Sequence, residues 1–152
     1  MLLPICVNAQ TVYQPQNAKA TIQVLKDKVK VGKNGKALLQ LTISPIEEFC
    51  IYSLKEKNGS PITIDLPELN GVKFGKPSES PNPKKIYDEG FEEYVFIHEK
   101  TTTLNIPVTV NSNIVKQKRI EIEVTIAFQS ISYSKGMAVY DFVPVKFIID
   151  LK

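Results

Sequence analysis

The chain has 152 residues, enough for one domain that buries its own apolar core without metals or disulfides. Its net charge of +3 is small, and its lysines are interspersed with acidic residues, which excludes a broad nucleic-acid-binding surface. No segment approaches the run of about 20 apolar residues that a membrane-spanning helix needs. We therefore expect a single domain with neither a nucleic-acid partner nor a membrane span.

The first nine residues resemble the end of a secretory signal peptide. A short apolar run leads to Val7-Asn8-Ala9, where a signal peptidase would read small residues. The charged start of such a signal is missing, so the leader looks incomplete, and an uncleaved N-terminus is the alternative. Cys6 follows Ile5 rather than a small residue, which argues against a lipoprotein attachment site. We expect export to the periplasm or beyond, in a bacterial cell envelope.

After the leader, residues 10–18 form an expected extended lead-in, and residues 19–152 form the folded domain. Apolar residues then recur at every second position, which predicts strands with one buried face. The alternation is clearest in four runs: Ala37, Leu39, Leu41 and Ile43; Leu104, Ile106, Val108 and Val110; Ile120, Ile122, Val124, Ile126 and Phe128; and Val143, Val145, Phe147, Ile149 and Leu151.

Turn residues agree with an all-β chain. Gly32-Lys33-Asn34-Gly35 predicts a β-hairpin, because Asn-Gly tolerates positive φ. Pro107 lies on the polar face of its strand and lacks an N–H, which predicts an edge or a bulge. Short strands with frequent turns predict a single-domain, immunoglobulin-like β-sandwich.

One long polar segment, residues 75–90, interrupts this pattern and is expected to be irregular. Long loops in compact domains are often functional or disordered. The start of the segment is rich in proline, which favours mobility. Its end, Ile86 to Phe91, places aromatic residues beside acidic ones, which suits a lid or a contact patch.

Cys50 has no internal partner if Cys6 leaves with the leader. An odd cysteine in an oxidising compartment is either buried and inert or free to react with another molecule. Cys50 lies in the apolar run Phe49-Cys50-Ile51-Tyr52, and no histidine or basic cluster is near it in sequence to lower its pKa. We favour a buried, inert thiol and keep a reactive one as the alternative.

Motifs for conventional catalysis are missing. His98 is the single histidine and lies in a strand-like run, so the sequence predicts no zinc site and no serine–histidine–acid triad. No Gly-x-Ser-x-Gly elbow and no phosphate-binding loop is present. We expect no metal, no cofactor and no conventional enzyme activity.

Residues 19–152 resemble the N-terminal periplasmic domain of the thiol:disulfide interchange protein DsbD. An ordered series of stretches carries this resemblance: Cys50-Ile51-Tyr52-Ser53, Gly59-Ser60-Pro61-Ile62-Thr63-Ile64, Lys85-Ile86-Tyr87-Asp88-Glu89-Gly90-Phe91, Thr103 to Val110, and Val124-Thr125-Ile126-Ala127-Phe128-Gln129. The resemblance implies an immunoglobulin-like fold and a periplasmic location. In that family, a cap loop shields a pair of cysteines until a partner displaces it.

By position in the resemblance, Ile131 and Ala138 stand where the two family cysteines would be. Neither can form a thiolate, so thiol–disulfide exchange cannot run through them. Cys50 is expected to lie away from this Ser130–Ala138 loop. The cap residues Tyr87, Asp88, Glu89 and Phe91 could keep a docking role, or the cap could simply cover an apolar patch around Ile131 and Met137.

Three hypotheses follow. The first is an exported, non-catalytic domain that binds another envelope protein, such as a thioredoxin-like or redox-related one, through the cap and the Ser130–Ala138 loop. The second is a participant in thiol–disulfide exchange that forms mixed disulfides through Cys50. The third is a small-ligand or glycan-binding sandwich with stacking surfaces on Tyr87, Phe91, Tyr133 and Tyr140.

Overall fold

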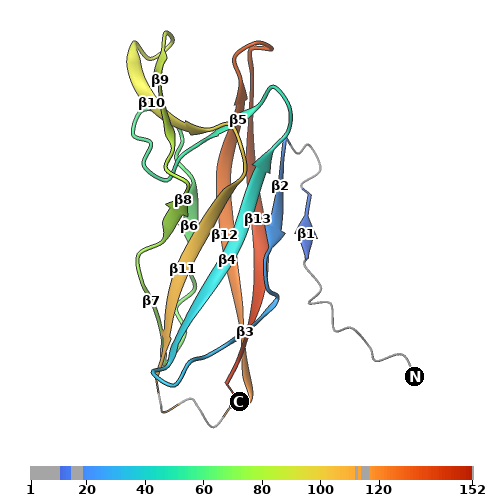
Figure 1. Cartoon of the computed structure of the whole chain (residues 1–152), viewed down its shortest axis with the longest axis vertical. Coiled ribbons are helices and arrows are strands. Elements are labelled where there is room, and N and C mark those ends of the chain that lie inside the picture. The colour runs from blue at the N-terminus through green and yellow to red at the C-terminus, as the bar shows by residue number, and fades with distance from the viewer. Residues whose placement is uncertain (1–10, 15–18, 112, 114–116, 152) are drawn as a thin grey trace, which may run out of the picture.

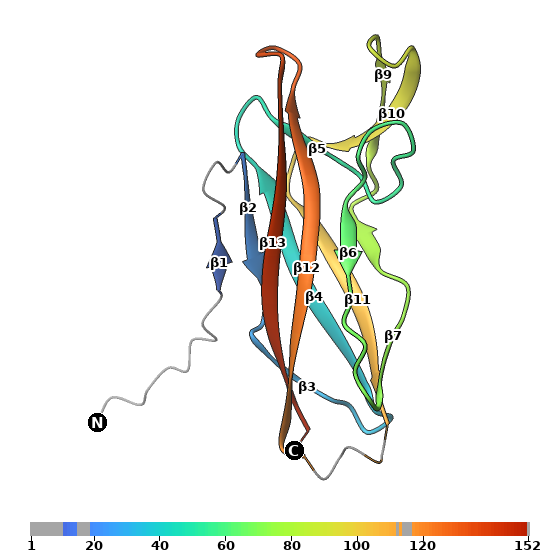
Figure 2. The ribbon, with the colours of Figure 1, turned by 180° about the vertical axis from the view of Figure 1, so that it is seen from behind.

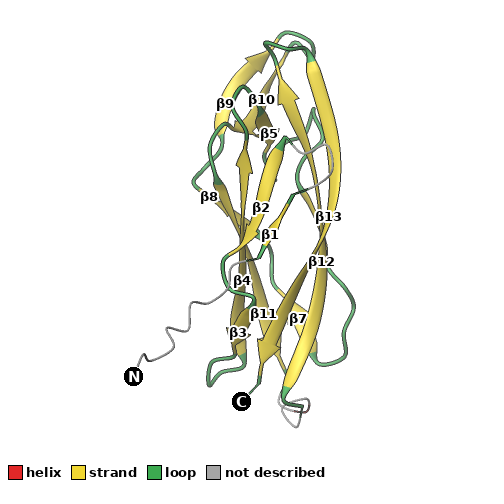
Figure 3. Cartoon of the chain, turned by 90° about the vertical axis from the view of Figure 1, so that its right-hand side faces the viewer, coloured by secondary structure: helices red, strands yellow, loops and turns green. Residues whose placement is uncertain are grey.

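The computed structural model describes residues 11–14, 19–111, 113 and 117–151. These residues form strands and turns and no α-helix (Figure 3). The expected leader, residues 1–9, lies outside the described residues. The strands are β1 (Val12–Tyr13), β2 (Ala20–Val24), β3 (Lys28–Lys30), β4 (Lys36–Pro45), β5 (Cys50–Tyr52), β6 (Thr63–Asp65), β7 (Val72–Phe74), β8 (Ser78–Ser80), β9 (Lys84–Asp88), β10 (Glu93–His98), β11 (Thr102–Val110), β12 (Arg119–Ser132) and β13 (Met137–Asp150).

The strands form two sheets that pack face to face (Figure 1). One sheet has the order β1-β2-β4-β11-β7, and β8 also pairs with β11. The other has the order β3-β13-β12-β5-β10-β9, and β6 also pairs with β12. Figure 2 shows the long β12–β13 hairpin running along most of the molecule. The fold is an all-β, immunoglobulin-like sandwich, which confirms the prediction.

The core lies between the inward faces of the long strands. Leu39, Leu41 and Ile43 of β4 are fully buried, and the polar residues between them are more exposed. The other three alternating runs are buried in the same way: Leu104, Ile106, Val108, Val110, Ile122, Val124, Ile126, Phe128, Val143, Val145, Phe147 and Ile149. Three residues at the ends of the predicted runs, Ala37, Ile120 and Leu151, are partly buried and pack against this core. Each such side chain stabilises the fold by about 1.5–3 kcal/mol relative to exposure. The period-two predictions are confirmed.

The turn at Gly32-Lys33-Asn34-Gly35 forms, but it does not close a β-hairpin. Gly35 has a φ of 76°, and its N–H donates to the carbonyl of Gly32 at 3.0 Å. The strands on either side belong to different sheets, because β3 pairs with β13 in parallel while β4 pairs with β2 and β11. The hairpin prediction is wrong: the turn passes the chain from one sheet to the other.

Residues 75–90 are more ordered than the sequence predicted, because they contain β8 and β9. The strand β8 pairs with β11, and β9 pairs with β10. Pro107 does not lie on an edge strand, since β11 has neighbours on both sides. It lies beside the break between β7 and β8, where the N–H of Gly75 donates to its carbonyl at 2.8 Å. A missing N–H is tolerated at such an interruption.

One end of the molecule carries a second, smaller apolar cluster. Here the β9–β10 hairpin projects beside the turn that joins β12 to β13 (Figures 1 and 2). The cluster consists of Cys50, Tyr52, Val95, Ile97 and Ile131, with Ile86 packed against it. It lies on the opposite face of its sheet from the main core, because Cys50 and Tyr52 alternate with the core residue Ile51.

Candidate functional site

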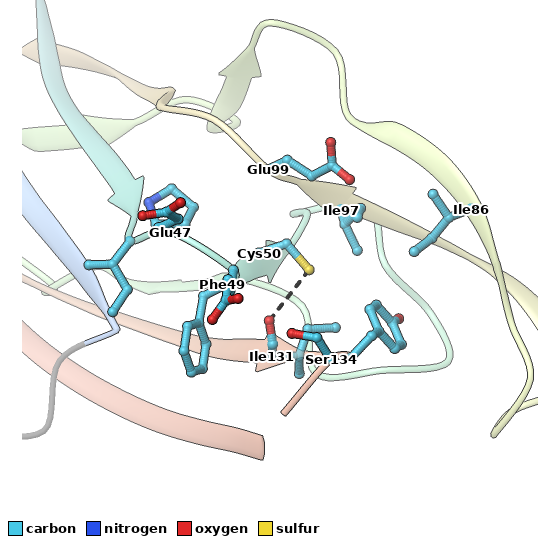
Figure 4. A pocket seen from close by; sticks show the side chains of 12 residues that line it. Glu47, Phe49, Cys50, Ile86, Ile97, Glu99, Ile131 and Ser134 are labelled. Carbon is cyan, nitrogen blue, oxygen red and sulfur yellow. Dashed lines mark hydrogen bonds between the residues drawn. The ribbon is translucent and has the colours of Figure 1, made fainter. Parts of the chain in front are cut away.

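A pocket of about 360 Å³ opens at this end of the sandwich. Figure 4 shows Cys50, Ile97 and Ile131 close together on its wall, with Ile86 of β9 further along. Glu47 and Glu99 are also among its lining residues. The wall is therefore apolar around the sulfur, and carboxylates lie near its opening.

Cys50, Ile131 and Ala138 form a row across three neighbouring strands. Cys50 of β5 pairs with Ile131 of β12, and Ile131 pairs with Ala138 of β13. Directly opposed residues of a sheet project from the same face. The prediction that Cys50 lies away from the Ser130–Ala138 segment is wrong, because β-pairing joins positions 81 residues apart in sequence.

The Ser130–Ala138 segment is mostly strand, not loop. The strand β12 continues to Ser132 and β13 starts at Met137, so only residues 133–136 form the turn. Gly136 lies in this turn with a φ of 60°, a conformation that glycine adopts without strain. The long paired hairpin holds Ile131 and Ala138 opposite each other on a rigid scaffold.

The Cys50 thiol is buried and protonated. Only 6% of the residue is exposed, and Sγ donates to the carbonyl of Ile131 at 3.7 Å. Burial, assisted by the negative charge of Glu99, raises the pKa of Cys50 to about 11. A thiolate is the reactive form, so Cys50 is a poor nucleophile near neutral pH. The expectation of a buried thiol is confirmed, and Cys6 lies outside the described residues.

The β9–β10 hairpin, here called the cap, is bonded to the β12–β13 turn through Asp88. One carboxylate oxygen of Asp88 accepts hydrogen bonds from the backbone N–H groups of Gly90 and Phe91, at 2.8 and 3.1 Å. The other accepts the hydroxyl of Tyr133 at 2.7 Å. The hydrogen bond from Tyr133 and those from the two backbone groups lower the pKa of Asp88, although burial opposes them. Asp88, as a carboxylate, therefore ties the cap to the β12–β13 turn, and Ile86 and Tyr133 from these two segments line the Cys50 pocket.

The tip of the cap presents aromatic and acidic groups to solvent. Tyr87 and Phe91 are 53% and 45% exposed, and Glu89 is also exposed. The rings of Tyr87 and Tyr94 contact each other edge to face, with their centroids 5.4 Å apart. The four cap residues singled out in the sequence thus divide into Asp88, which holds the cap in place, and three residues that face outward.

At the base of the cap lies a buried polar cluster that the sequence did not reveal. His98 of β10, predicted only as a strand residue, bonds through Nε2 to Oε2 of Glu79 at 2.8 Å. Ser53 donates to the other oxygen of Glu79. Burial alone would raise the pKa of Glu79, but the hydrogen bonds from His98, Ser53 and the backbone of Leu54 outweigh it and lower that pKa. The carboxylate stands between serine and histidine, which is not the order of a catalytic triad.

The four aromatic residues proposed as stacking surfaces do not contact one another as a group. Tyr87 contacts Tyr94, Tyr133 donates to Asp88, and Tyr140 packs edge to face on Phe142 at 4.9 Å. Tyr140 and Phe142 are exposed and alternate with buried residues of β13. The ligand-binding hypothesis stays a prediction, with two separate aromatic pairs rather than one platform.

Across the described residues, no three histidine, cysteine, aspartate or glutamate side chains gather closely enough to hold a metal ion. No helix in that part of the chain has the length and apolarity that crossing a membrane requires.

Comparisons with known proteins match the fold and not the sequence. No sequence profile of a known family matches the chain, and no curated protein matches it. The N-terminal periplasmic domain of ScsB from Proteus mirabilis is 11% identical, with a TM-score of 0.62 over 95% of this chain and 51% of that one. The N-terminal domain of Neisseria meningitidis DsbD in its reduced form is 15% identical, with a TM-score of 0.50 over 80% and 81%. The GAE domain of yeast GGA1 is 9% identical, with a TM-score of 0.51 over 91% and 98%.

These likenesses establish the fold that the chain shares with the DsbD domain. The chain spans about half the length of the ScsB structure, which is 51% covered. A yeast domain matches about as well as the DsbD domain does, so the fold by itself does not decide the function. That Ile131 and Ala138 stand at the family's cysteine positions stays a prediction.

Proposed function

We propose that the chain is an exported, non-catalytic domain that binds another protein of the bacterial cell envelope through its cap. One observation carries the proposal: Asp88 bonds the cap to Tyr133 beside the Cys50 pocket, while Tyr87, Glu89 and Phe91 remain exposed at the cap tip. Exposed aromatic residues on a rigidly held hairpin suit a protein-docking surface. The partner expected from the resemblance is a thioredoxin-like or redox-related protein.

The row formed by Cys50, Ile131 and Ala138 supports a role without redox catalysis. Ile131 and Ala138 carry no sulfur, and they face each other directly in the hairpin. Cys50 provides the sulfur of the pocket, but its pKa of about 11 keeps it protonated. Once Cys6 has left with the leader, Cys50 alone cannot form an internal disulfide, and a two-electron reduction of a partner would need a second thiol.

A periplasmic or secreted location is part of the proposal. It is supported by the leader-like start of the sequence and by the likeness of the fold to the periplasmic domain of ScsB. In this setting the domain would dock with a protein of the envelope and leave the exchange chemistry to that partner.

The test is recovery of partner proteins from an envelope extract with three immobilised proteins: the unaltered chain, Phe91→Ala and Phe142→Ala. Both phenylalanines are exposed, at 45% and 68%, but Phe142 lies on β13 and not on the cap. We expect Phe91→Ala to lose a protein that the other two retain. Equal recovery by all three proteins would exclude docking through the cap.

A second candidate function is favoured by the position of Cys50 beside Ile131 in an open pocket. In this alternative, the Cys50 thiol loses its proton and attacks a disulfide of a partner protein. A mixed disulfide forms, the partner's S–S bond breaks, and the partner's other sulfur leaves as a thiolate. Rapid labelling of the native protein by a thiol reagent would support this role, whereas labelling only after denaturation would exclude it.

A further inference from the structure

A second concave surface lies on the flank of the sandwich, apart from the Cys50 pocket. It has a volume of about 1100 Å³ and lies between β6 of one sheet and β8 of the other. These two strands run side by side in Figures 1 and 2. The partly buried apolar residues Leu54, Ile64 and Phe96 line it. The surface is here called the flank groove.

The flank groove is positively charged. Lys55, Lys57 and Lys76 line it and are exposed, and none of them forms an ion pair with a residue that the structure describes. Their ammonium groups are therefore free to meet a ligand. At low salt concentration, these lysines should therefore attract acidic groups of a ligand.

The two carboxylates that also line the groove are buried, whereas the three lysines are exposed. Glu56 is 5% exposed and accepts from the backbone N–H groups of Lys57 and Asn58, at 2.7 and 2.9 Å, and from that of Phe96 at 2.8 Å. The side chain of Glu79 is 2% exposed and is bonded to His98. Three exposed lysines against two buried carboxylates leave an excess of positive charge, and the groups that an incoming ligand reaches first are the lysines.

The strands beside the groove have backbone available for pairing. β6 pairs only with β12, and β8 pairs only with β11, so each strand keeps one edge without a partner strand among the described residues. An extended peptide can add to such an edge through main-chain hydrogen bonds, while alternate side chains enter pockets beside it. A volume of about 1100 Å³ suits several residues rather than one ion.

We propose that the flank groove binds an extended acidic segment of a partner protein, in which carboxylates alternate with apolar side chains. The carboxylates meet Lys55, Lys57 and Lys76, and the apolar side chains cover Leu54, Ile64 and Phe96. The groove includes Phe96 of β10 but none of the exposed residues at the cap tip, and it does not depend on the function proposed for the cap.

The test uses a fluorescein-labelled peptide of about ten residues, enough to span a strand edge, in which glutamate and valine alternate. Fluorescence anisotropy at low ionic strength measures its binding to the full chain. The groove variant carries Lys55→Glu, Lys57→Glu and Lys76→Glu. The control variant carries Lys28→Glu, Lys30→Glu and Lys33→Glu, which changes net charge equally at exposed positions on and after β3. A melting curve of each variant establishes that it is folded.

We expect saturable binding, weakened about ten-fold or more by the groove variant and less than about two-fold by the control. Amide chemical shifts should move at Ile64 and Phe96 on peptide addition, which locates binding even if the triple variant fails to fold. The proposal is overturned if no saturable binding occurs at millimolar peptide, or if the control weakens binding as strongly. It is also overturned if a lysine–valine peptide binds equally, or if phosphatidylglycerol vesicles bind and the peptide does not.

Discussion

Removing one hydroxyl should loosen the cap. In Tyr133→Phe, the carboxylate of Asp88 loses its 2.7 Å bond to Tyr133 but keeps its two backbone donors. A hydrogen bond to a charged group contributes about 1.5–3 kcal/mol. Tyr133 is 54% exposed, so water replaces part of the lost hydrogen bond. We therefore expect the free energy of cap opening to fall by about 1–2 kcal/mol. Cap opening should then become about 5–30 times more populated.

Labelling of the Cys50 thiol measures that opening, because Ile86 of the cap packs against the cluster that contains Cys50. The native protein is treated with a thiol reagent, and the mass of the peptide that contains Cys50 is followed over time. The rate should rise about 5–30-fold in Tyr133→Phe, in proportion to the open population. Low urea concentrations should hardly change the labelling rate, since local opening of the cap exposes little surface.

The matched control is Tyr94→Phe. Tyr94 lies on β10 of the cap and is as exposed as Tyr133, at 54%, and its ring contact with Tyr87 survives the loss of the hydroxyl. Its labelling rate should stay near that of the unaltered chain. The role of the Tyr133 hydroxyl in holding the cap is ruled out if Tyr133→Phe labels no faster than the unaltered chain, or if both variants label faster to the same degree.

Three further predictions follow from the site and its surroundings. Ile131→Cys should form a disulfide with Cys50 on mild oxidation, because paired positions on adjacent strands lie within disulfide range. Counting free thiols checks this. A free thiol at position 131 in the oxidised protein would contradict the pairing of Cys50 with position 131. Glu79 has a lowered pKa in the folded protein, so its stabilisation is present above its ordinary value of 4.5 and is lost as pH falls through the lower folded value. Urea unfolding of Glu79→Gln should thus show lower stability at neutral pH and a flatter acid slope below about pH 4.5, and an unchanged slope would argue against the assignment. Asp141 is buried, its Oδ2 has no hydrogen-bond partner among the described residues, and burial raises its pKa. Asp141→Val should therefore raise the free energy of unfolding by about 1 kcal/mol at neutral pH. A decrease in that free energy, measured by urea unfolding, would show that the Asp141 carboxylate does not destabilise the fold.

The strands of the core could be predicted because burial of one face imposes a period of two on the sequence. β4, β11, β12 and β13 show this plainly, and each has its alternate residues buried. Pairing between strands leaves no such local signal. The parallel pairing of β3 with β13, and the break beside Pro107, depend on contacts between distant segments.

The site was harder to predict than the fold for the same reason. The sequence indicated that Cys50 is buried and that the cap ends in exposed aromatic residues, but not that Cys50 pairs with Ile131. The buried bond between Glu79 and His98 joins β8 of one sheet to β10 of the other. Glu79 lies in a proline-rich polar stretch, where nothing in the local sequence marks it as buried.

The most direct test of the proposed docking role places a photoreactive benzoylphenylalanine at the position of Phe91 in one version of the chain and at that of Phe142 in another. Both positions are exposed, at 45% and 68%, but only Phe91 lies in the turn of the cap, between β9 and β10. After export and irradiation in bacterial cells, the account predicts a discrete crosslinked protein from position 91 and none from position 142. No crosslink at position 91, or the same product from both positions, would contradict docking through the cap.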